Sequence, residues 1–121
     1  MFNVDFYRLP NEKAPVEEFL DGLNMKMRNK ALDSLSLLEE FGNTLREPHS
    51  KPIGDGIFEL RIKFSSDISR IFYFFFVDNN IILTNGFIKK TRKTPRDEIE
   101  LAKKYKTDFE NRMNHKRGGS K

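Results

Sequence analysis

The feature that most restricts the fold of this chain is an unbroken apolar run from Ile71 to Val77. The run is rich in phenylalanine, and aromatic residues are common in strands. A membrane-spanning helix needs about 20 apolar residues, so this run is too short to cross a bilayer. The sequence therefore predicts a buried strand over residues 69–77.

Further β patterns surround this strand. Apolar and charged residues alternate from Ile57 to Phe64, which predicts a strand with one buried face. Asp78-Asn79-Asn80 predicts a turn, and residues 81–88 then form the last strand of an antiparallel meander. Residues 2–9 alternate in the same way and predict a first strand. Residues 44–56, with their prolines and glycines, are expected to form a loop.

Helical spacing of apolar residues appears in the remaining segments. Pro15 is expected to begin a first helix, with acidic residues in its first turn, where the helix dipole favours them. A second helix is predicted from Met25 to Phe41, with Gly42 as its C-terminal cap. A final helix is predicted to be capped by Thr94 and to carry an apolar stripe as far as Met113.

This order predicts one α+β domain. Strand, helix, helix, three strands and helix would place the helices on one face of a mostly antiparallel sheet. The 121 residues suit a single domain, which we expect to span residues 1–113. Residues 114–121 are polar and contain glycine, and are expected to form a disordered tail.

Composition limits which partners and which kinds of functional site are possible. The net charge is +4, and Lys and Arg are concentrated between Arg61 and Lys106, which favours nucleic acid as a partner. There is no cysteine, which excludes a disulfide, a thiolate nucleophile and a zinc–thiolate site. The N-terminal residues do not resemble a signal peptide, so a cytoplasmic location is expected. His49 and His115 are interpreted as ordinary solvated side chains.

The candidate site is a group of cations in the C-terminal half. Arg61 and Lys63 are two residues apart on a predicted strand and therefore share a face, with Arg70 at the start of the next strand. A charged strand face is also the ordinary pattern of an amphipathic sheet, so solvated side chains are the competing interpretation. The candidate catalytic residues are Arg61, Lys63, Arg70, Lys89 and Lys90. The candidate RNA-binding residues are Tyr73, Phe87, Arg92 and Lys93, the aromatic pair as a stacking surface, although core packing is the competing interpretation for Phe87.

These segments also carry a family resemblance. Phe58-Glu59-Leu60-Arg61-Ile62-Lys63, Ser69-Arg70-Ile71-Phe72-Tyr73, Gly86-Phe87-Ile88-Lys89-Lys90 and Thr94-Pro95 follow one another in the chain. Together they resemble the C-terminal half of the RelE/ParE superfamily of toxins, and most closely its HigB-type, phage-derived Gp49-like branch. The resemblance implies the small RelE-like fold, and order and spacing agree over nearly the whole chain.

The resemblance implies a toxin of a type II toxin–antitoxin system. Such a toxin enters the ribosomal A site and cleaves the mRNA there, and a cognate HigA-like helix-turn-helix antitoxin neutralises it. Operator DNA would be contacted only through the antitoxin, and no membrane, metal or cofactor is implied. The RNA 2′-hydroxyl would act as the nucleophile, with Arg61 and Arg70 stabilising the phosphate. Lys63, Lys89 or Lys90 would act as the base.

Part of the family pattern is missing. The C-terminal tyrosine that RelE-like nucleases carry near the active site has no secure counterpart, because Tyr105 lies on the apolar stripe of the last helix. This departure bears on the acid/base assignments more than on the overall function. Two other functions also stay open on the same fold. One is a ParE-like inhibitor of DNA gyrase, and the other is a non-catalytic nucleic-acid-binding phage accessory protein. The fold alone does not separate them.

Overall fold

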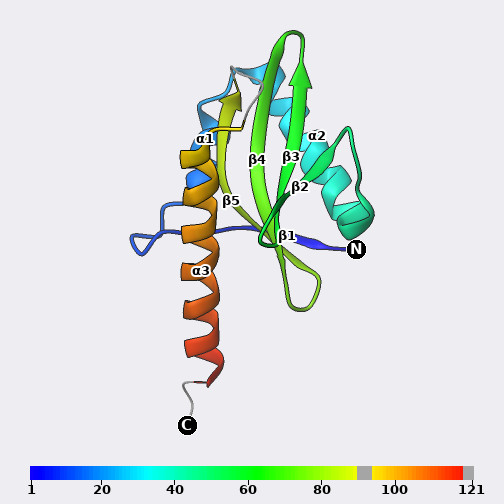
Figure 1. Cartoon of the computed structure of the whole chain (residues 1–121). Coiled ribbons are helices and arrows are strands. Elements are labelled where there is room, and N and C mark those ends of the chain that lie inside the picture. The colour runs from blue at the N-terminus through cyan, green and yellow to red at the C-terminus, as the bar shows by residue number, and fades with distance from the viewer. Residues whose placement is uncertain (90–93, 119–121) are drawn as a thin grey trace.

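A mixed β-sheet runs through the middle of the protein in the computed structural model, which describes residues 1–89 and 94–118, with side chains up to Lys116 (Figure 1). Within these residues the sheet has five strands in the order β1-β5-β4-β3-β2. The strands are β1 (Asn3–Phe6), β2 (Ser50–Gly54), β3 (Ile57–Phe64), β4 (Asp67–Phe76) and β5 (Asn80–Lys89). β1 lies parallel to β5, and the other neighbouring strands are antiparallel. The predicted α+β fold is confirmed, and so is the predicted strand over the apolar run, which is β4.

The helices are α1 (Pro15–Asp21), α2 (Met25–Phe41) and α3 (Arg96–Gly118), with a short 3-10 helix η1 (Gly42–Thr44) after α2. The predicted bounds of α2 are confirmed. Asn24 caps its first turn by accepting a hydrogen bond from the backbone N–H of Met27 at 2.9 Å. Gly42 follows the helix with a φ of 50°, a conformation that glycine adopts without strain.

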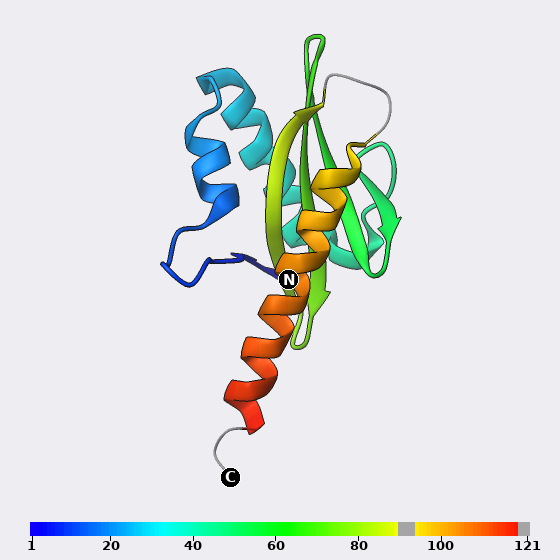
Figure 2. The ribbon, with the colours of Figure 1, turned by 60° about the vertical axis from the view of Figure 1, so that its left-hand side comes forward.

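The helices cover both faces of the sheet, so the expectation that they would share one face was wrong. Figure 2 shows α1 and α2 on one side of the strands and α3 on the other. The reason lies in β4, whose residues alternate between the two faces. Ile71 and Tyr73 are buried against the α1–α2 layer, whereas Phe72 and Phe74 are buried against α3. A strand that is apolar on both faces needs a cover on both.

Other segments also differ from the sequence-based predictions. Residues 50–54 form β2 instead of a loop; proline is tolerated at Pro52 because β2 is an edge strand. The first strand ends at Phe6, earlier than the predicted Leu9. α3 continues past Met113 to Gly118, so residues 114–118 are helical and not a disordered tail. Residues 119–121 lie outside the described part of the chain.

Among the described residues, the protein contains no helix with the length and apolar character needed to cross a membrane.

Candidate nucleic-acid site on the sheet

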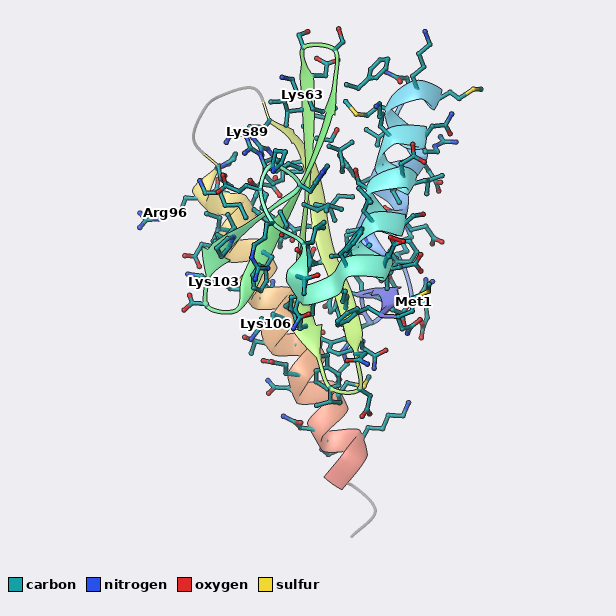
Figure 3. The ribbon with its side chains drawn as sticks, turned by 90° about the vertical axis from the view of Figure 1, so that its right-hand side faces the viewer. Met1, Lys63, Lys89, Arg96, Lys103 and Lys106 are labelled. Atoms are coloured by element: carbon teal, nitrogen blue, oxygen red, sulfur yellow. The ribbon has the colours of Figure 1, made fainter. Side chains whose placement is uncertain are left out.

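Strand register brings the predicted cations to one end of the sheet, on the face that also carries α3. Lys63 lies opposite Ile68, which in turn lies opposite Lys89. In the adjacent row, Arg61 lies opposite Arg70, and Arg70 lies opposite Phe87. Cross-strand partners point to the same face and are about 5 Å apart, so these side chains form one group. Figure 3 shows Lys63 and Lys89 near each other at this end.

A further cation comes from β2. Lys51 lies opposite Glu59, two residues before Arg61 on β3, and therefore points to the same face. The sequence did not reveal Lys51 as a site residue because Pro52 made its segment resemble a loop. We define the cationic face as Lys51, Arg61, Lys63 and Lys89. Its residues come from three strands and are half-buried or exposed.

Beneath the cationic face lies a buried ion pair. Arg70 donates a hydrogen bond from Nη1 to Oε1 of Glu59 at 3.0 Å, and both side chains are 2% exposed. The other Glu59 oxygen accepts a hydrogen bond from the Thr94 hydroxyl at 3.0 Å, which ties the residue preceding α3 to the sheet. Glu59 alternates with Arg61 and Lys63 in the sequence, but nothing in that pattern shows that it is buried. The ion pair therefore depends on the tertiary structure.

Arg70 does not have the exposed position expected of a phosphate ligand. Its guanidinium has almost no surface open to solvent, and its Nε has no hydrogen-bond partner among the described residues. Burial lowers the pKa of Arg70, an effect that Arg61 adds to and Glu59 opposes. Arginine still stays protonated in proteins. Arg70 therefore supplies a fixed positive charge under the cationic face.

Lys89 has an electrostatic environment different from that of an ordinary surface lysine. Partial burial lowers the pKa of its ammonium group, and the positive charges of Arg70, Arg61 and Lys51 lower it further. Glu59 acts in the opposite direction. A lysine with a lowered pKa is neutral more often near neutral pH, and a neutral amine can accept a proton.

The aromatic residues do not form the predicted stacking surface. Tyr73 is 1% exposed and lies on the α1–α2 face of the sheet, opposite the cations, where its hydroxyl hydrogen-bonds with Ser50. Its predicted RNA-binding role is therefore wrong. Phe87 does lie on the cationic side but packs against Phe72, with a distance of 5.3 Å between ring centroids. It belongs to the core beneath α3.

The remaining candidates have diverse positions. Lys90, Arg92 and Lys93 lie outside the described residues. His115 is exposed near the C-terminal end of α3, the end that extends beyond the sheet in Figure 1. His49 is exposed just before β2, and its backbone oxygen accepts a hydrogen bond from the Arg61 N–H at 2.8 Å. Within residues 1–89 and 94–118, His, Asp and Glu side chains form no group of three or more that could hold a metal ion.

Comparison with known proteins assigns the chain to a family. Residues 18–107 match the family model described as phage derived protein Gp49-like (DUF891). A comparison with curated proteins gives no significant match. The matched range includes α2, β2 to β5 and the first half of α3, and therefore all of the cationic face. The chain belongs to the phage-derived Gp49-like family, a family of RelE/HigB-like toxins.

Proposed function

We propose that this protein is the toxin of a type II toxin–antitoxin system and that it cleaves mRNA on the ribosome. The main support is the convergence of Lys51, Arg61, Lys63 and Lys89 on one end of the sheet, above the buried charge of Arg70. Cations in such an arrangement attract the phosphates of a nucleic acid. Membership of a family of RelE/HigB-like toxins supports the same assignment.

The proposed reaction uses the RNA itself as the nucleophile. The 2′-hydroxyl loses its proton to the neutral amine of Lys89, and the 2′ oxygen forms a bond to the adjacent phosphorus. The bond from phosphorus to the 5′ oxygen breaks, and that oxygen takes a proton from the solvent or from a neighbouring ammonium group. The products are a 2′,3′-cyclic phosphate and a free 5′-hydroxyl. Protein groups would hold the nucleotide in line and stabilise the charge.

Each cation has a role in this scheme that follows from its position. Arg61 and Lys63 are accessible and would contact the phosphate oxygens, on which negative charge increases in the transition state. Arg70 is buried and would act as a positioning residue, because its charge lowers the pKa of Lys89 without touching the RNA. Glu59 holds Arg70 in place through their hydrogen bond.

The partners in this proposal are the ribosome with its mRNA and a cognate antitoxin. The A site is surrounded by RNA, so a cationic face also suits docking there. A HigA-like helix-turn-helix antitoxin with acidic side chains could neutralise the same face or block entry into the ribosome.

The test is primer extension on a reporter mRNA in a reconstituted translation reaction. The wild-type protein should produce cuts in the reading frame that require ribosomes. Lys89→Ala should reduce cleavage by about 10²–10⁴-fold, the usual contribution of a general base. Arg61→Ala should reduce it by about 10²–10³-fold through lost charge stabilisation.

The control is Lys104→Ala, which removes an exposed lysine from α3, outside the cationic face. This variant should cleave like the wild type. Intact mRNA with the wild-type protein would refute the nuclease function, and DNA breaks caused by the wild type would then point to gyrase inhibition. Cuts that persist in Lys89→Ala and Arg61→Ala would leave the function in place and refute the site.

A further inference from the structure

A pocket opens at the edge of the sheet, next to the cationic face. β2 pairs with β3 only as far as Ser50 opposite Leu60, and among the described residues the hydrogen bond from Arg61 N–H to the His49 oxygen is the last one along this edge. Beyond it, β3 is flanked by α2 instead of a strand, on the side that faces the viewer in Figure 3. The space between them is a cavity of about 440 Å³. This volume lies within the range of small-molecule binding pockets.

The lining of this edge pocket combines charge with an apolar surface. Its polar residues are Lys30, Asp33, Ser34, His49, Arg61 and Lys63. Leu37, Pro48 and Ile68 add apolar surface. The charged side chains of the lining are thus three cations and one carboxylate, and the imidazole of His49 lies beside them. A flat ring with polar edges and an attached phosphate is complementary to such a lining, because the ring can contact the apolar side chains and the phosphate the cations.

Arg61 and Lys63 belong both to the cationic face and to the edge pocket. An RNA strand whose phosphates are bound on the cationic face would therefore pass these residues directly into the pocket. Asp33 supplies the carboxylate of the pocket lining and can therefore accept hydrogen bonds from a base held there. Asp33 is exposed, and among the described residues it has no hydrogen bond or ion pair that would occupy it.

We propose that the edge pocket binds a nucleotide that flanks the cleaved bond, and that Asp33 selects guanine there. A carboxylate only accepts hydrogen bonds, and it can accept two in parallel. Guanine presents two neighbouring donors on its Watson–Crick edge, its ring N–H and its amino group, whereas adenine, cytosine and uracil cannot offer that pair. Lys30 and Lys63 bind the phosphates of this nucleotide without regard to its base. The inference rests on the proposed function because it assumes that the cationic face binds RNA.

The experiment measures binding separately from cleavage. Labelled 2′-O-methyl RNA hexamers lack the nucleophilic hydroxyl and therefore remain intact, and their affinity is measured by fluorescence anisotropy. One set carries a single guanine at each position in turn, in a uridine background. The wild-type protein should bind the best guanine-containing hexamer about tenfold more tightly than the all-uridine hexamer, which is the scale of one base-specific pair of hydrogen bonds.

Two variants distinguish base selection from phosphate binding. Asp33→Ala should bind every hexamer with at least the affinity that the wild type has for the all-uridine hexamer. The affinity can be somewhat higher because the variant has lost a negative charge. Lys30→Ala should weaken binding to every hexamer by a similar factor and keep the preference for guanine. Glu40→Ala is the matched control because it removes an exposed carboxylate from the same helix, outside the pocket, and its guanine preference should equal that of the wild type.

The outcomes separate this inference from the proposed function. A wild-type protein without a guanine preference, or an Asp33→Ala variant that keeps it, refutes base selection in the edge pocket even if mRNA is cleaved. A guanine preference that depends on Asp33, together with intact mRNA in the primer-extension test, supports the pocket and refutes the nuclease. Circular dichroism of each variant verifies that its fold is unchanged.

Discussion

Arg70 and Glu59 form an ion pair with a distance of 3.0 Å on the face of the sheet that carries α3, and each side chain is 2% exposed. Charges in such a position are stable only as a pair, because each would otherwise lose its hydration without compensation. The pair fixes a positive charge directly below the cationic face. It therefore links the stability of the sheet to the electrostatics of the candidate site.

Removal of one partner of the Arg70–Glu59 ion pair should destabilise the fold. Arg70→Ala leaves the Glu59 carboxylate buried without its cation, and the free energy of unfolding should fall by about 3–5 kcal/mol. The Arg70→Ala/Glu59→Ala double variant should lose less than the sum of the two single variants. Urea unfolding of all four proteins gives this coupling energy. Strictly additive losses would show that the two side chains do not stabilise each other.

The pH dependence of cleavage should show whether Lys89 acts as the general base. A general base acts in its deprotonated form, so the rate should increase with pH and level off above the pKa of Lys89. The midpoint of this rise should lie below the ordinary lysine pKa of 10.5, because burial and the neighbouring cations lower the pKa of Lys89. Single-turnover cleavage measured against pH tests this. The Lys89→Arg variant keeps the charge and should lose the activity; a variant with the wild-type profile would exclude Lys89 as the base.

The salt dependence of RNA binding should show how many of the accessible cations contact phosphates. If the four residues of the cationic face and Lys30 each contact one phosphate, the logarithm of the affinity for 2′-O-methyl RNA should fall with the logarithm of salt concentration with a slope of about −3.5. Lys51→Ala should reduce the magnitude of the slope by about 0.7. Lys104→Ala should leave it unchanged. A flat salt response would contradict electrostatic docking.

The alkaline limit of stability should depend on Tyr7, which donates a hydrogen bond to Asp108 on α3 at 2.7 Å. Burial, and then Asp108, raise the pKa of Tyr7 from 10.0 to about 12. Between these values the unfolded chain loses the proton and the folded chain keeps it, so the stability from this group is complete below pH 10 and is lost as pH rises toward 12.

Tyr7→Phe should remove the hydrogen bond, lower the free energy of unfolding at pH 7 by about 1–2 kcal/mol, and flatten the alkaline decline. Tyr73 and Tyr105 also have raised pKa values because of burial and remain in both proteins, so the difference between the two pH profiles isolates Tyr7. Urea midpoints from pH 7 to 11.5 measure it. Parallel profiles would contradict the assignment.

Gly42 should be intolerant of a side chain. Its φ is +50°, and an added Cβ would overlap the Phe2 ring. Gly42→Ala should lower the free energy of unfolding by about 2 kcal/mol or more, through backbone strain and displacement of the ring. Gly22→Ala is the control, because Gly22 has an ordinary helical φ and its nearest contacts are at 3.6 Å or beyond. Equal thermal unfolding temperatures of the two variants would refute this explanation of why residue 42 is glycine.

The sequence by itself determined the local elements and much of the site. Helical spacing, Asn24 and Gly42 specify α2, and strict alternation specifies β3, because a pattern in the chain directly reflects one face of a helix or strand. The shared face of Arg61 and Lys63 follows from the same period. The family resemblance rested on these segments, and the match over residues 18–107 confirms it.

Only the tertiary structure decided which face each group occupies and what is buried. The run around Tyr73 is apolar at every position, so alternation could not show that Tyr73 points away from the cations and Phe72 toward α3. β2 needed β3 as its partner, because an edge strand with a proline has little signal of its own. The pairing of Glu59 with Arg70 and the approach of Asp33 to the edge of β3 join residues far apart in the chain. Such contacts depend on how layers pack, and no local pattern encodes them.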